Sequence, residues 1–230
     1  MKFHFSTANQ ILFGSGTVNR VAPLAAERGS RPLVLTGGSP ERVSGVMDAL
    51  TAEKMKTNRY TVATEPTVDT ALAAVRIARR AECDLVIGIG GGSVIDTGKA
   101  VAALITNSGR LEDYLEVIGS ARPLAHRSAP YIAVPTTAGT GSEVTRNAVL
   151  GSPQHRVKVS MRSPFMLPDL AVIDPELTLS LPSAITAVTG LDAFTQLMEA
   201  FVSNQSNALT DGICREGLHR AARSLQRAYA

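Results

Sequence analysis

The sequence predicts an α/β fold, a Rossmann-like parallel sheet with helices on both faces, followed by the start of an all-helical domain. Strands and helices alternate up to about residue 144, which is typical of βαβ crossovers in an open parallel sheet. Residues 84–89 form a continuous apolar strand of the kind that is buried on both faces. Beyond Pro182 the pattern is helical only. We therefore expect an α/β domain over residues 1–178 and the first helices of an incomplete helical domain over residues 179–230.

In the first half of the chain, residues that begin or end helices predict the boundaries of the secondary-structure elements. Gly29 stops the first helix, and Thr67 can cap the third because apolar residues at helical spacing follow it. Apolar segments between such signals are expected as strands. The expected elements are a β-hairpin (3–13), a helix (18–28), a strand (32–35), a helix (41–56), a strand (60–63), a helix (67–81), a strand (84–89), a helix (93–105) and a strand (131–134).

The second half of the chain changes character. Two extended segments follow residue 144 and are expected to pair antiparallel, one more strand comes next, and helices complete the chain. The expected elements are extended pieces at 144–150 and 156–161, a strand at 170–173, and helices at 183–186, 191–202 and 209–226.

Composition excludes several classes of protein. The chain has 230 residues, 44% of them hydrophobic, and a net charge of +3, so intrinsic disorder is excluded. The longest apolar stretches fall far short of the roughly 20 residues that span a bilayer, and the N-terminus lacks the apolar region of a signal peptide. The arginines are scattered and there is no Trp, so neither nucleic acid nor membrane is an expected partner. Cys83 and Cys214 lack any paired spacing, which predicts buried thiols in a cytoplasmic protein.

A glycine run follows the strand at 84–89 and opens the next helix. Glycines there let the chain approach a bulky anion, and the first N–H groups of the helix can hold phosphate. The spacing is not the usual GxGxxG, because Ser93 occupies the third glycine position. For this loop alone, the alternative is a tight strand–helix turn in which Ser93 and Asp96 form a capping box.

A second loop, Pro135-Thr136-Thr137-Ala138-Gly139-Thr140-Gly141-Ser142-Glu143, also follows a buried strand and supplies hydroxyl and N–H groups. Carboxyl ends of parallel strands share one edge, so both loops are expected to meet one phosphorylated ligand. A third loop, Thr36-Gly37-Gly38-Ser39, carries no acidic residue that would repel a 2′-phosphate. This absence favours NADP over NAD.

These loops resemble those of the iron-containing (group III) alcohol dehydrogenases. The residues Gly90-Gly91-Gly92-Ser93-Val94-Ile95-Asp96 pair with the second loop, and a third block agrees: Ile173-Asp174-Pro175, Leu179-Ser180-Leu181-Pro182, then Thr189-Gly190-Leu191-Asp192-Ala193-Phe194 and Glu199. The resemblance implies a dinucleotide-binding domain followed by a helical metal domain, a homodimer, and hydride transfer between nicotinamide and an alcohol or aldehyde. It assigns NADP or NAD to Gly91, Gly92, Ser93, Asp96, Thr136, Thr137, Thr140, Lys158 and Leu177, with Gly37 and Glu65 on the adenosine side.

The metal site departs from the family pattern. The resemblance implies a divalent metal, Fe or Zn, that polarises the substrate oxygen and is held by one Asp and three His. Asp192 matches the first ligand, but the second position, four residues on, is Gln196, a neutral and weaker ligand. The other two His belong downstream, whereas this chain stops at Ala230 and His219 lies too early.

We therefore expect a complete cofactor domain with a C-terminally truncated metal domain. Apolar side chains of the last helices, namely Leu197, Met198, Phe201 and Leu218, should be left partly exposed. Three readings stay open: an NAD(P)-dependent oxidoreductase assisted by metal, a catalytically silent NAD(P)-binding fragment, and a relative of glycerol dehydrogenase or dehydroquinate synthase. The block from Thr189 to Glu199 argues against the third.

Overall fold

The structure is a computed structural model that describes residues 2–39 and 43–230. The chain packs into two compact units. The larger contains residues 7–136 and 142–177, and the smaller contains residues 2–6, 137–141 and 178–230. The helix expected from residue 41 begins partly outside the described residues; within them it starts at Ser44.

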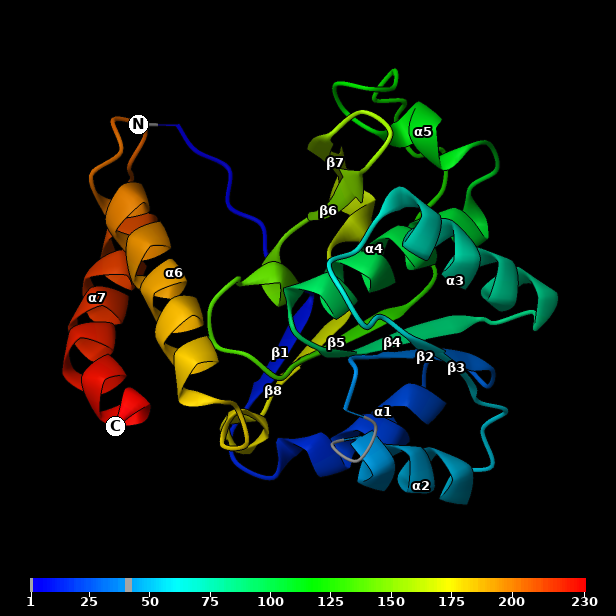
Figure 1. Ribbon diagram of the computed structural model, residues 1–230, viewed down its shortest axis with the longest axis horizontal. Helices are drawn as coiled ribbons and strands as arrows, with labels where there is room; N and C mark the ends of the chain where they lie inside the picture. The colour runs from blue at the N-terminus through cyan, green and yellow to red at the C-terminus, as the bar shows by residue number, and fades with distance from the viewer. Residues whose placement is uncertain (1, 40–42) are drawn as a thin grey trace. The chain divides into compact units, whose positions relative to one another are not determined.

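A six-stranded sheet forms the centre of the larger unit (Figure 1). All of its strand pairs are parallel, in the order β1-β8-β5-β4-β2-β3, as an α/β fold requires. The strands are β1 (Gln10–Phe13), β2 (Pro32–Thr36), β3 (Asn58–Thr61), β4 (Leu85–Gly90), β5 (Tyr131–Pro135) and β8 (Leu170–Ile173).

The register brings the carboxyl ends of the central strands to one level. Thr36 of β2 lies opposite Ile89 of β4, and Ile89 lies opposite Val134 of β5. The loops that begin at Gly37, after Gly90 and at Thr136 therefore leave the sheet along one edge, as the sequence predicts.

Helices cover both faces of the sheet, as expected (Figure 1). Side chains alternate between the faces: Leu33 and Leu35 join one core cluster, and Val34 joins the other. This double burial explains why the strands are continuously apolar. The first cluster packs under α3 (Val68–Arg80) and α4 (Gly92–Thr106), and the second packs under α1 (Val21–Ala26) and α2 (Ser44–Ala52).

A separate β-hairpin covers part of the α4 face. Strands β6 (Asn147–Ser152) and β7 (Val157–Arg162) pair antiparallel, which confirms the two extended pieces predicted from the sequence. Alternate residues, among them Leu150 and Val159, enter the same core cluster as α3 and α4. Shorter elements complete this unit: η1 (Thr17–Arg20), α5 (Leu111–Tyr114), η3 (Ser142–Val144), η4 (Pro164–Met166) and most of η5 (Pro175–Thr178).

The predicted N-terminal β-hairpin is wrong. Only residues Gln10–Phe13 form a strand, and β1 pairs in parallel with β8, about 160 residues later in the chain. The backbone N–H of Asn9 donates to the carbonyl of Pro168 at 3.0 Å, which starts this ladder. Local alternation could not reveal a partner so far away in the sequence.

The smaller unit is mainly a pair of helices, α6 (Ser183–Phe201) and α7 (Ala208–Tyr229). The predicted break in the first of them is wrong, because α6 continues through Gly190. A Cβ at Gly190 would overlap the side chain of Leu225, so this glycine permits close packing of α7. Met198 and Phe201 are exposed, as expected, and Leu197 and Leu218 are half-buried.

Both cysteines, Cys83 and Cys214, are buried free thiols, as the sequence predicts. Burial raises the pKa of the Cys83 thiol, which keeps it protonated and unreactive. Among residues 2–39 and 43–230, no helix has the length and apolar character needed to cross a bilayer.

A buried tyrosine gives the first testable prediction. Gly88 and Gly98 leave room for Tyr131, whose hydroxyl donates to the carbonyl of Ile95 at 3.0 Å. A Cβ at Gly88 would overlap that hydroxyl, so Gly88→Ala should lower the free energy of unfolding in urea by about 1–3 kcal/mol. The control is Gly45→Ala in α2, where nothing lies within 4 Å, and it should be neutral or stabilising by up to about 1 kcal/mol. Equal effects would contradict this packing role.

Candidate functional site

The first turn of α4 presents unpaired backbone donors. Gly91 is the N-cap residue, in an extended conformation, and no side chain caps the helix. The first N–H groups of the helix that are hydrogen-bonded are those of Val94 and Ile95, both of which donate to the carbonyl of Gly91. Along the described chain, the N–H groups of Gly92 and Ser93 have no protein acceptor. A helix start of this kind is suited to bind an anion.

The alternative reading of this loop as a capping box is wrong. The Asp96 carboxylate does not reach back to the helix start. It accepts hydrogen bonds from the hydroxyl of Ser142 and from the N–H of Val149 (3.1 Å), and it pairs with Lys99. The glycine run is therefore free of a side-chain cap.

The second loop lies directly beside the first. The backbone N–H of Thr136 donates to the carbonyl of Gly90 at 3.0 Å, so the two loops start side by side at the carboxyl edge. Thr136 is nearly buried. Thr137 and Thr140 belong to segment 137–141, which packs within the helical unit.

Not every glycine of the run serves a ligand. Gly88 gives space to Tyr131, and a Cβ at Gly90 would overlap the side chain of Val94. By contrast, a Cβ at Gly37 or Gly38 would meet nothing within 4 Å, so the third loop is open. The sequence could not separate glycines that pack from glycines that expose backbone.

A buried lysine holds this region together. The Lys99 side chain is 0% exposed, and its ammonium lies 3.0 Å from the Asp96 carboxylate. It also donates to the carbonyl (2.9 Å) and hydroxyl (2.7 Å) of Ser142 and to the hydroxyl of Thr145 (3.0 Å). These bonds tie α4 to η3 and so fix the start of the β6–β7 hairpin. Sequence reasoning missed Lys99, although a single lysine among apolar helix residues was a usable signal.

Burial changes the proton affinity of this cluster. Burial lowers the pKa of Lys99, and the neighbouring Asp96 opposes that shift. Burial also raises the pKa of Glu143, with its backbone hydrogen bond and Lys99 acting in the other direction. Glu143 therefore retains its proton to a higher pH than an exposed glutamate.

Two of the predicted cofactor residues meet at the edge of a groove. Glu65, in the loop after β3, forms an ion pair with Lys158 of β7, and both side chains are largely exposed. The hairpin is joined to this loop by the N–H of Gly151, which donates to the carbonyl of Pro66 at 2.8 Å. The groove has a volume of about 320 Å³. Leu177, in contrast, packs against the core cluster on the α1–α2 face.

The predicted metal ligands do not make a metal site by themselves. Asp192 and Gln196 are exposed on α6, and the Gln196 amide donates to the carbonyl of Gly139 at 3.4 Å. One carboxylate and one amide are too few for iron or zinc, which need three or four protein ligands. Across residues 2–39 and 43–230, no three His, Cys, Asp or Glu side chains converge. His219 is exposed beside Arg223, as expected of a surface histidine.

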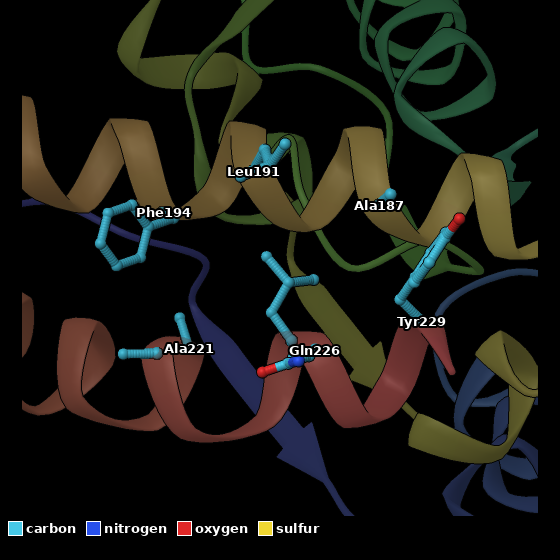
Figure 2. A pocket seen from close by; sticks show the side chains of 8 residues that line it. Ala187, Leu191, Phe194, Ala221, Gln226 and Tyr229 are labelled. Carbon is cyan, nitrogen blue, oxygen red and sulfur yellow. The ribbon is translucent and has the colours of Figure 1, made fainter.

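An apolar cavity of about 410 Å³ lies between α6 and α7 (Figure 2). Figure 2 shows Leu191 and Phe194 on one helix and Ala221 on the other. The polar side chains that line it are Gln226 and Tyr229, so it holds no acid–base pair. Its chemistry is that of a packing surface and not of a reaction site.

Comparisons with known proteins identify the family of this chain. Residues 8–175 match the model of the family described as "Iron-containing alcohol dehydrogenase". Long-chain-alcohol dehydrogenase 1 of Geobacillus thermodenitrificans is 37% identical over 223 residues, 94% of this chain and 55% of the relative.

Several solved structures cover the whole chain. An alcohol dehydrogenase from Oenococcus oeni has a TM-score of 0.92 at 29% identity and covers 100% of this chain and 61% of its own. Sulfoacetaldehyde reductase from Bifidobacterium kashiwanohense, in complex with NAD+, has a TM-score of 0.91 at 29% identity. The match covers 100% of this chain and 61% of the reductase chain.

The fold and the edge loops define a Rossmann-like α/β protein. The chain belongs to the iron-containing alcohol dehydrogenase family, which confirms the resemblance seen in the sequence. It spans a little over half the length of the relatives described above.

The buried ion pair gives a second prediction. Lys99→Met leaves Asp96 without its cation and should lower the free energy of unfolding by about 3 kcal/mol. Lys99→Met combined with Asp96→Asn should cost less than the sum of the single changes, because the uncompensated charge is gone. Urea unfolding measures both, with the exposed Lys56→Met as control. Strict additivity would contradict the pairing.

The raised pKa of Glu143 gives a prediction about pH. Because the folded-state pKa lies above the ordinary value of 4.5, this group's stabilising contribution is complete below pH 4.5 and is lost as pH rises through the folded value. Glu143→Gln mimics the protonated acid, so its stability relative to the parent should rise from pH 4 to pH 7. Unfolding titrations at a series of pH values measure this, with the exposed Glu53→Gln as the matched surface variant. A variant that follows the parent at every pH would contradict it.

Proposed function

We propose that this chain binds a nicotinamide dinucleotide and serves hydride transfer between that cofactor and an alcohol or aldehyde. The observation that carries the proposal is the uncapped start of α4 beside the Thr136 loop. The relative from Bifidobacterium kashiwanohense, which is similar in fold, is described in complex with NAD+.

The pyrophosphate would lie against the N–H groups of Gly92 and Ser93, where the helix dipole favours negative charge. Gly91, which has no side chain, would let the cofactor approach the backbone. The other predicted contacts are proposals of the same kind: Gly37, Glu65, Asp96, Thr137, Thr140, Lys158 and Leu177. Asp96 is 14% exposed and is already engaged by Lys99, so it orients the loop.

We propose NADP as the preferred cofactor, because Gly37 and Gly38 leave open space where a carboxylate would otherwise repel a 2′-phosphate. A bound nicotinamide would donate the hydride in aldehyde reduction and accept it in alcohol oxidation. The chain's own contribution is to hold and orient the dinucleotide and to shield its phosphates from water.

A second candidate function is dinucleotide binding without turnover. The donor set of Asp192 and Gln196 favours it, since Gln196 already uses its amide on Gly139 and neither residue has a further ligand beside it among the described residues. Metal analysis of the purified chain separates the two candidates: stoichiometric iron or zinc supports the oxidoreductase, and metal-free dinucleotide binding supports the silent module.

A homodimer is also proposed. Within the part of the chain that the structure describes, β1 lies at the edge of the sheet beside β8, and its side chains Ile11 and Phe13 are exposed. A second chain can cover an edge of this kind.

A carboxylate at the N-cap gives the prediction for this function. Asp is a good N-cap residue, so Gly91→Asp should leave stability unchanged or slightly raised. Its carboxylate would accept hydrogen bonds from the same N–H groups as the cofactor and would repel the phosphates. The affinity for NADPH, measured by calorimetry, should therefore fall at least 100-fold. Gly212→Asp in α7, where a side chain meets open space, is the matched control. Unchanged NADPH binding by Gly91→Asp would contradict the site.

A further inference from the structure

We propose that Arg59 binds the 2′-phosphate of NADP and is the residue that makes this chain prefer NADP over NAD. The inference rests on the proposed dinucleotide site, which it deepens by naming a specificity-determining side chain on β3. The sequence patterns singled out the open glycines of the neighbouring loop and gave no role to this arginine.

The sheet order places the adenosine ribose beside β2. If the pyrophosphate lies at the start of α4, after β4, the adenosine half extends along the sheet edge. One neighbour of β4 is β5, whose loop already adjoins the phosphate site, and the other is β2. Gly37 follows Thr36, which lies level with Ile89 at the end of β4. A ribose bound there would direct its 2′ position at the Gly37–Ser39 loop.

The guanidinium of Arg59 is held at that point. Its Nε and Nη2 each lie 3.3 Å from the hydroxyl oxygen of Thr36, the last residue of β2. Arg59 pairs with Val34 across the β2–β3 ladder, so it shares the α1–α2 face of the sheet with Thr36. The arginine therefore reaches along the strand toward the carboxyl edge.

Arg59 forms no ion pair with a carboxylate among the described residues, so its charge is available to a ligand. The residue is exposed. A guanidinium has five N–H donors, and Thr36 occupies two of them through one oxygen. The remaining donors can make the paired hydrogen bonds to phosphate for which arginine is suited.

The adjoining loop has the shape that this ligand requires. Gly37 and Gly38 present no Cβ, and a Cβ there would meet nothing within 4 Å, so a phosphate has room. A free cation and an open loop without a carboxylate thus meet at the position where a ribose would lie. Neither feature alone would indicate a binding site, but together they favour the 2′-phosphate of NADP over the 2′-hydroxyl of NAD.

The test is calorimetric titration of the purified full chain with NADPH and NADH, which differ only in the 2′-phosphate. The parent should bind NADPH at least tenfold more tightly than NADH. Arg59→Gln should lose about tenfold to a hundredfold in NADPH affinity and less than twofold in NADH affinity, because only the phosphate contact is removed. Arg59→Lys, which keeps the charge without the fork, should fall between the two.

Two further variants keep the inference falsifiable. Arg80→Gln, an exposed arginine at the C-terminal end of α3, is the matched control and should bind both nucleotides like the parent. Gly37→Asp leaves Arg59 in place but adds a carboxylate beside the phosphate, so it should weaken the binding of NADPH. Thermal unfolding by circular dichroism confirms that each variant is folded.

The outcomes separate this inference from the function beneath it. An Arg59→Gln chain that retains the parent's preference for NADPH overturns the role of Arg59. A parent that prefers NADH overturns it as well, while the dinucleotide site stands. A parent that binds neither nucleotide contradicts the proposed function and this inference together.

Discussion

The buried ammonium of Lys99 constrains the region around the candidate site. A charge removed from water must find acceptors, and Lys99 finds the Asp96 carboxylate together with the oxygens of Ser142 and Thr145. These partners come from α4, from η3 and from the residue that follows η3, just before the β6–β7 hairpin. Satisfying one side chain therefore fixes where the chain returns to α4 after the second loop, and it engages the carboxylate of Asp96.

The start of α4 is free because its N-cap residue, Gly91, has no side chain and no other side chain caps the helix. The N–H groups of Gly92 and Ser93 therefore stay available for an anion. The bond between Thr136 and Gly90 keeps the second loop in place beside them. The apolar cavity of about 410 Å³ between α6 and α7 is not lined by such donors, so volume alone does not identify the candidate site.

Much of the larger unit could be predicted from the sequence because its signals are local. Continuous apolar strands, the Thr67 cap and the glycine run all act within a few residues, and the Thr67 hydroxyl does accept the N–H of Thr70 at 3.1 Å. The parallel pairing of β1 with β8 depends on residues far apart in the chain, so a local hairpin was predicted in its place. The continuity of α6 through Gly190 likewise depends on Leu225 of the next helix.

The same distinction applies to the candidate site. Glycines and hydroxyls in loops after buried strands were visible in the sequence, whereas the roles of Lys99 and Arg59 depend on partners that only the fold brings near. Lys99 meets Ser142 from 43 positions away, and Arg59 meets Thr36 from 23. Sequence patterns thus located the edge of the sheet where a ligand would bind, and tertiary contacts identify the charged groups that shape it.

The most direct test of the central claim is a two-dimensional ¹H–¹⁵N NMR titration of the labelled chain with NADPH. The account predicts the largest shifts at the backbone amides of Gly91, Gly92 and Ser93, with a second group at Thr136 and Gly37. Shifts confined to α6 and α7, or no shifts at saturating NADPH, would contradict the claim that the start of α4 is the dinucleotide site.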